Sequence, residues 1–120
     1  MLQLHQSVAA AIALYMLILG IWGLVAAARS GVTPSYRGSL AVAEVLTLVE
    51  AAIGGLLLVA GDRPGDPLHF LYGALVPLGI PATYIFAHTR SPRRAALLYG
   101  IATLFIVGLT IRAIMTGRPS

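Results

Sequence analysis

The sequence predicts an all-α integral membrane protein whose four helices form an up-down bundle. Of its 120 residues, 58% are hydrophobic and only 10% are charged, whereas ordinary soluble domains are about a quarter charged. The apolar residues also gather into four runs of about 20 residues, the length that crosses a hydrocarbon core as a helix. Because lipid cannot satisfy backbone hydrogen bonds, such runs are expected to be helical.

A single transmembrane domain is expected to take in residues 1–120. Its four expected spans are similar in length and cover about residues 5–28, 40–60, 67–88 and 93–115. The first run has no basic residue before it and exceeds the apolar region of a cleaved signal peptide, so we expect it to be retained. The loop before the second run contains Gly31, Pro34 and Gly38, which are residues typical of turns.

Local signals mark the third and fourth helices. Asp66-Pro67 and Ser91-Pro92 each place a capping residue before a proline suited to the first helical position. Pro77 and Pro81 lie inside the third run, where each removes a helical hydrogen bond, so a kink is expected. Thr116-Gly117 predicts the end of the fourth helix.

Arginine accounts for every positively charged residue, and five of the eight arginines belong to the first and third loops: Arg29, Arg37, Arg90, Arg93 and Arg94. The positive-inside rule therefore places these loops in the cytoplasm. We expect a multi-pass protein of the plasma (inner) membrane of a bacterium, with both termini outside. Arginines at the ends of apolar runs favour lipid headgroups as partners over nucleic acid.

Two Leu-His pairs open membrane-length apolar runs. Leu4-His5 precedes a run that ends at Arg29-Ser30, and Leu68-His69 precedes one that ends at Arg90-Ser91, with another apolar run between the two. The repeat suggests two duplicated helical hairpins related by an axis along the membrane normal. Counted back from the arginines, the two histidines differ in depth by three residues, about 4.5 Å. They are therefore expected at one level near the outer face.

This placement predicts a cofactor or metal site between His5 and His69. The first and third helices of an up-down bundle lie diagonally, roughly 14 Å apart when neighbouring axes are about 10 Å apart. That gap suits two imidazoles with a metal between them, each nitrogen about 2 Å from it. Ala9 and Gly73, one turn further on, are small, and Tyr72 could line the pocket. Three arginines at the outer level could meet haem propionates: Arg63, Arg112 and Arg118.

Two histidines on same-direction helices of a four-helix bundle resemble the small four-helix haem-b membrane proteins, in particular one half of a haem A synthase. Each half of that family holds a haem between two histidines whose separation is similar to the interval from His5 to His69. The resemblance implies haem b with these two residues as axial ligands. The chain departs from the family because it has only one half, no cysteine pair and no glutamate directly before either histidine. The resemblance therefore implies the binding bundle without the oxidising chemistry.

The residues leave alternatives open. Histidines at helix ends also occur in the headgroup layer without any cofactor, and another metal or a quinone contact is a further alternative. Glu50 lies close to mid-membrane by count, where it could relay protons, contact a quinone or make a structural hydrogen bond to another helix or subunit. Glu44 could pair with Arg37 or Arg90. The lack of cysteine excludes disulfides, iron–sulfur clusters and thiolate metal sites.

Two function classes follow. The first is a small membrane haem-b protein for electron transfer or haem handling, ligated by two histidines near the outer face. The second is a non-catalytic small subunit that packs against a larger respiratory or photosynthetic membrane complex, or against copies of itself. An enzyme in its own right is the least expected function, because no domain outside the membrane is predicted that could shape a substrate site. The sequence also contains no nucleophile–base pair, phosphate-binding loop or dinucleotide fingerprint.

Overall fold

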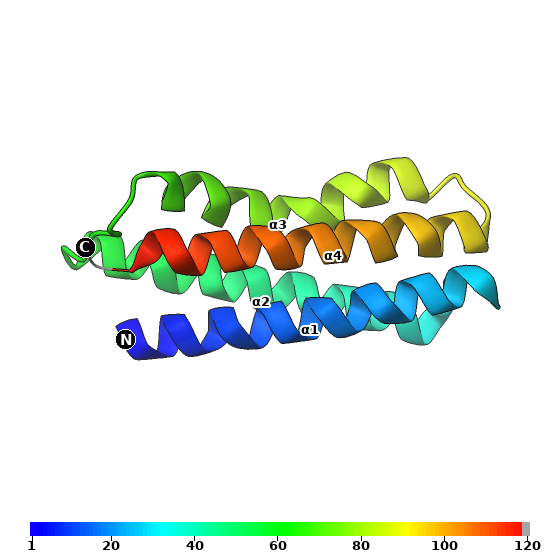
Figure 1. The fold of residues 1–120 in the computed structure, drawn as a ribbon, viewed down its shortest axis with the longest axis horizontal. Helices are drawn as coiled ribbons and strands as arrows, with labels where there is room; N and C mark the ends of the chain where they lie inside the picture. The colour runs from blue at the N-terminus through cyan, green and yellow to red at the C-terminus, as the bar shows by residue number, and fades with distance from the viewer. Residues whose placement is uncertain (119–120) are drawn as a thin grey trace.

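The computed structural model describes residues 1–118 and contains four helices in an antiparallel up-down arrangement (Figure 1). The helices are similar in length: α1 (Leu2–Ala28), α2 (Pro34–Val59), α3 (Leu68–Ala87) and α4 (Pro92–Gly117). No strand occurs in this part of the chain. The bundle measures 47 × 21 × 20 Å, and its long dimension matches a bilayer of about 40–45 Å including headgroups. The predicted fold class is confirmed.

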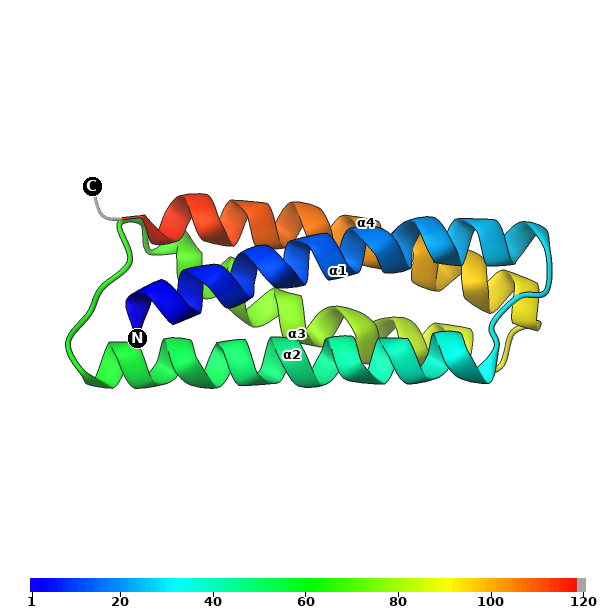
Figure 2. The ribbon, with the colours of Figure 1, turned by 90° about the horizontal axis from the view of Figure 1, so that it is seen from below.

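Each helix packs against two neighbours. α1 packs most extensively on α4, and α3 also packs on α4, whereas α2 contacts α1 and α3 more thinly. α1 and α3 face each other across the bundle diagonal without a close approach of their backbones, and so do α2 and α4. Figure 2, which turns the bundle by 90°, shows α1 crossing between α4 and α2. The predicted diagonal placement of the two histidine-bearing helices is therefore confirmed.

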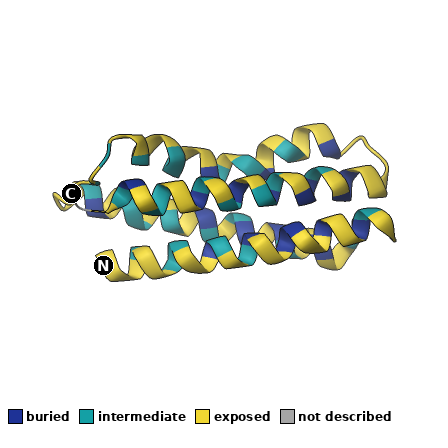
Figure 3. Cartoon of the chain, in the orientation of Figure 1, coloured by how far each residue is buried: buried dark blue, intermediate teal, exposed yellow. Residues whose placement is uncertain are grey.

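The outer surface of the bundle is apolar. All four helices are long and apolar enough to cross a membrane, and only 17–28% of the residues in their apolar windows are buried. Large side chains such as Ile85 (65% exposed) and Phe105 (67% exposed) point away from the bundle, and exposed residues run along every helix (Figure 3). A surface this apolar is stable in contact with lipid and not in contact with water. The chain is a small integral membrane protein with four spans.

Glycines allow α1 and α4 to approach closely. A Cβ atom added to Gly23 would lie 2.7 Å from Gly100 Cα, and one added to Gly20 would overlap the Leu104 side chain. Small residues of this kind let two membrane helices bring their backbones together. The helix that Gly20 and Gly23 allow to come close is α4.

The start of α2 corrects the predicted boundary. The helix begins at Pro34, not at residue 40, and Thr33 caps it by accepting a hydrogen bond from Tyr36 N at 3.2 Å. Pro34 and Gly38 are therefore helical and not turn residues, because a proline at the first helical position forfeits no hydrogen bond. As a consequence, Glu50 lies about one helical turn past the midpoint of α2, nine residues before its last residue, Val59.

The other predicted boundaries are close to the structure. Ser91 caps α4 by accepting a hydrogen bond from Arg94 N at 3.3 Å, and α4 ends at Gly117. The Asp66 side chain accepts from Leu68 N at 2.9 Å, while Pro67 is the capping residue of α3. α3 continues through its two internal prolines and is visibly bent (Figure 1).

Candidate functional site

A cavity of about 550 Å³ occupies the end of the bundle where His5 and His69 lie, which we call the histidine end. Residues from all four helices line it, including Glu50 of α2 and Thr110 of α4. Its volume falls within the range of about 300–1,000 Å³ that is usual for small-molecule and cofactor sites. The walls are mostly apolar, so the few polar groups that line the cavity determine its chemistry.

His5 of α1 is held against α2 by two contacts. Its imidazole lies over Gly54, where an added Cβ would come within 3.1 Å of His5 Cε1. Its Nδ1 lies 2.6 Å from Glu50 Oε1, one helical turn before that glycine. Because a carboxylate can only accept, His5 donates Nδ1–H to it. The lone pair of the neutral ring is therefore on Nε2.

His69 of α3 is held against α4 in the same manner. Its ring lies over Gly117, where an added Cβ would come within 2.8 Å of His69 Cε1. Its Nδ1 donates to the carbonyl oxygen of Ala113 at 2.7 Å, again one turn before the glycine. A backbone carbonyl is an acceptor only, so this bond also leaves the ring's lone pair on Nε2.

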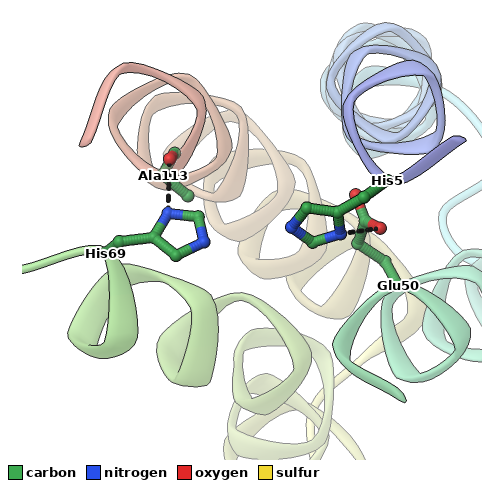
Figure 4. Close-up of polar contacts among 4 residues, drawn as sticks. All are labelled: His5, Glu50, His69 and Ala113. Atoms are coloured by element: carbon green, nitrogen blue, oxygen red, sulfur yellow. Dashed lines mark hydrogen bonds and ion pairs between the residues drawn. The ribbon is translucent and has the colours of Figure 1, made fainter. Parts of the chain in front are cut away.

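The two histidines, which both line the cavity, face each other (Figure 4). Their ring centroids are 6.1 Å apart and their planes are inclined by 79°. Figure 4 shows the nitrogen of each ring that is not engaged by Glu50 or Ala113 pointing toward the other ring. The structure thus brings two imidazoles from diagonal helices to one level, each with its free nitrogen facing the gap.

The contacts of the two histidines repeat along the sequence at a common interval. Glu50 and Ala113 accept the hydrogen bonds of the two histidines, and Gly54 and Gly117 lie beneath their rings. The number of residues from Glu50 to Ala113 equals the number from Gly54 to Gly117. The interval from His5 to His69 is longer by a single position. The α1–α2 and α3–α4 hairpins therefore hold their histidines equivalently, with one difference: a carboxylate serves in the first hairpin and a backbone carbonyl in the second.

Four further predicted site residues line the cavity: Ala9, Gly73, Arg63 and Arg118. An added Cβ at Gly73 would meet no atom within 4 Å, so this glycine borders open space. Tyr72 and Arg112 are not among the described lining residues. They contact each other instead, with the Arg112 guanidinium carbon 5.7 Å from the centroid of the Tyr72 ring.

The side chains of Glu44 and His88 are engaged locally. Glu44 does not pair with Arg37 or Arg90 in the part of the chain that the structure describes; its Oε1 lies 3.4 Å from Thr47 Oγ1, within hydrogen-bonding distance. His88 donates Nδ1–H to the carbonyl oxygen of Tyr84 in α3, 2.9 Å away. Within residues 1–118, no group of three or more histidine or acidic side chains could hold a metal ion.

Sequence reasoning missed the His5–Glu50 pair. A partner for Glu50 on another helix was predicted and is present, but counting from a wrong helix start placed the carboxylate too deep to meet His5. The repeat of the α1–α2 hairpin in the α3–α4 hairpin aligns Glu50 with Ala113 and Gly54 with Gly117. This alignment is the sequence signal that could have indicated the pair.

These observations define the class of protein: a four-span integral membrane bundle with a two-histidine cavity at one end. Comparison with protein-family models, with curated proteins and with solved structures finds no match to this chain. The function is therefore argued from the geometry of the cavity.

Proposed function

We propose that the protein binds one haem b between His5 and His69 and serves electron transfer or haem handling at the histidine end. The observation that carries the proposal is the spacing of the two imidazoles. A metal–nitrogen bond is about 2 Å and a ring centroid lies about 1 Å behind its nitrogen, so two axial imidazoles require centroids roughly 6 Å apart. The centroids of His5 and His69 are 6.1 Å apart.

The hydrogen bonds on the far side of each ring support this assignment. Histidines that ligate metals usually donate their other N–H to a carboxylate or a backbone carbonyl, which fixes the tautomer and the orientation of the ring. Glu50 provides the first kind of acceptor and Ala113 the second. Both rings are therefore oriented as axial ligands before any cofactor binds.

The cavity also suits a flat, largely apolar macrocycle. Small residues make up much of its wall: Ala9, Ala51, Gly55, Gly73, Ala74 and Ala113. A porphyrin supplies four in-plane nitrogens, which matters because two histidines alone do not complete a metal's coordination. Arg63 and Arg118 line the same cavity and would pair with the propionates by charge-assisted hydrogen bonds.

A haem held by His5 and His69 would supply one-electron chemistry. The contribution of this chain is to hold the two rings at the required distance, to keep their lone pairs directed at the gap and to exclude water with apolar walls. This combination favours electron transfer or storage of haem over oxygen chemistry.

Visible spectroscopy of the purified full-length protein tests the proposal. The protein, expressed with haem supply, should show a Soret band and a reducible α band of a low-spin six-coordinate haem. His5→Ala and His69→Ala should each abolish the six-coordinate spectrum, while His88→Ala, which removes a histidine at the other end, should leave it unchanged. Protein that takes up no haem even on reconstitution would contradict the proposal. Co-purification of haem-free protein with a larger membrane complex would favour the small-subunit function.

A further inference from the structure

A second cavity, of about 300 Å³, lies at the opposite end of the bundle. This end carries Arg29, Arg37, Arg90, Arg93 and Arg94, and we call it the basic end. The cavity is bounded by the loop between α1 and α2, the first turn of α2, the end of α3 and the start of α4. In Figure 1 these segments meet where the cyan and yellow loops lie.

The polar side chains that line this cavity are two arginines, a histidine and two tyrosines. Arg37, His88 and Arg90 line it, and no carboxylate does among the described residues. The chain has only four acidic residues. Glu50 contacts His5, and Asp62 and Asp66 belong to the loop at the histidine end. Glu44 lies seven residues after Arg37 in α2. Within residues 1–118, no arginine forms a salt bridge with a carboxylate. The guanidinium groups of Arg37 and Arg90 therefore lack a carboxylate counter-ion within the described residues.

The surroundings add to this positive potential. α2 and α4 both begin at the basic end, and the N-terminus of a helix carries a partial positive charge that favours anions. The His88 ring is stacked on Tyr84, with centroids 5.0 Å apart, and its Nδ1 bonds to Tyr84 O. Its Nε2 is therefore the nitrogen left to meet a ligand.

Apolar groups form the other wall. Val32 from the first loop, buried Ala87 of α3 and buried Ala95 of α4 line the cavity beside the cations. An inorganic anion makes no use of such a wall. An ester of phosphate does, because its organic part can lie on the apolar side while its oxygens meet the arginines.

We propose that this cavity holds the phosphate group of an anionic membrane lipid, with Arg37 and Arg90 contacting the phosphate oxygens. Arginine matches phosphate geometry with two parallel N–H donors, and basic pockets between membrane helices at a membrane surface are suited to acidic headgroups. The lipid tails continue onto the apolar outer surface of the bundle. The proposal is independent of the cofactor at the histidine end, since the two cavities share no residue.

Lipid binding to the full-length protein, measured by native mass spectrometry and by thermal stability in lipid nanodiscs, tests this proposal. Phosphatidylglycerol should bind saturably and raise the unfolding temperature relative to phosphatidylcholine alone. The double variant Arg37→Gln/Arg90→Gln should bind phosphatidylglycerol about tenfold more weakly or worse, because two charge-assisted contacts are lost. The matched variant Arg29→Gln/Arg94→Gln removes the same charge from the same end, outside the cavity lining, and should bind like the wild type.

Three results would overturn the proposal: equal binding of the two lipids, equal weakening by the matched variant, or competition by inorganic phosphate at the affinity of the lipid. The last would assign the site to a free anion. If the glutamine variant fails to fold, Arg37→Lys/Arg90→Lys is measured instead. Lysine keeps the positive charge but cannot form the bidentate hydrogen bonds of a guanidinium group. The binding of this variant should be weaker than that of Arg29→Lys/Arg94→Lys, and equal binding by the two lysine variants would refute the site.

Discussion

At the scale of single residues, the two histidines differ in what they bond to behind the cavity. His5 donates to the Glu50 carboxylate, whereas His69 donates to the neutral carbonyl of Ala113. A carboxylate acceptor gives an imidazole more anionic character and makes it a stronger ligand to ferric iron. Glu50 Oε2 is buried without a hydrogen-bond partner in the described structure, which costs stability. Glu50 therefore lowers stability and contacts His5, a candidate ligand. A role in the site explains its presence better than packing does.

Glu50→Gln should raise the reduction potential of the bound haem by roughly 50 mV, about the equivalent of a tenfold change in a one-electron equilibrium. Glutamine keeps an acceptor oxygen for His5 Nδ1–H and removes the negative charge that favours the oxidised iron. A redox titration followed at the α band measures the shift. Glu44→Gln, at the other carboxylate of the same helix, serves as the control and should not move the potential. An unchanged potential in Glu50→Gln would show that the carboxylate does not act on the iron.

Gly73→Leu should exclude the cofactor without damaging the fold. The side chain would project into the open space beside this cavity-lining glycine and occupy the volume proposed for the macrocycle. Gly108→Leu is the matched control, because Gly108 also has open space around it but is not among the described lining residues. Both variants should unfold no more easily than the wild type, since each replaces a helical glycine, a change worth about 1 kcal/mol. The haem-to-protein ratio should fall only for Gly73→Leu, and equal ratios would refute the placement.

At the scale of elements, the close contact of α1 with α4 holds the bundle together. Gly23→Ala would place a Cβ 2.7 Å from Gly100 Cα, so the two backbones would have to move apart. We expect a loss of about 1–3 kcal/mol in the free energy of unfolding, the usual effect of overpacking. Gly38→Ala, where an added Cβ meets nothing within 4 Å, should leave stability unchanged or slightly raised. Unfolding of the two variants in mixed detergent micelles measures the difference.

The helices were predictable because their signals are local, while the lining of the cavity was not. Apolar runs of membrane length and Ser91 before Pro92 depend only on neighbouring residues. The start of α2 was misread because Pro34 is compatible both with a turn and with the first position of a helix. That error displaced Glu50 and concealed its contact with His5.

The common level of His5 and His69 was predictable because the arginines that end the two runs fix a shared reference depth. The glycines beneath the rings were not, because their role depends on how α2 and α4 are rotated about their axes. That rotation is determined by packing among all four helices, which the pattern of one helix does not contain.

At the scale of the whole molecule, the two ends of the bundle differ in chemistry. The histidine end holds the larger of the two cavities and the amino terminus, whose place Figure 1 shows. The basic end holds five arginines, and among the described residues no carboxylate lines its cavity. Positively charged segments resist translocation, so arginine-rich loops stay in the cytoplasm. The charge difference between the ends therefore predicts which face of the membrane each cavity occupies.

Reporter fusions test this orientation. Alkaline phosphatase fused after Ser120, which lies outside the described residues, should be active because it is exported, and a fluorescent protein fused there should stay dark. The same reporters placed after Ser30, in the first loop, should behave in the opposite way. Activity of a cytoplasmic reporter at the carboxyl end would invert the topology. It would move the histidine cavity to the cytoplasmic side and place the proposed lipid site in the outer leaflet, so an electron partner would have to be sought on the other face of the membrane.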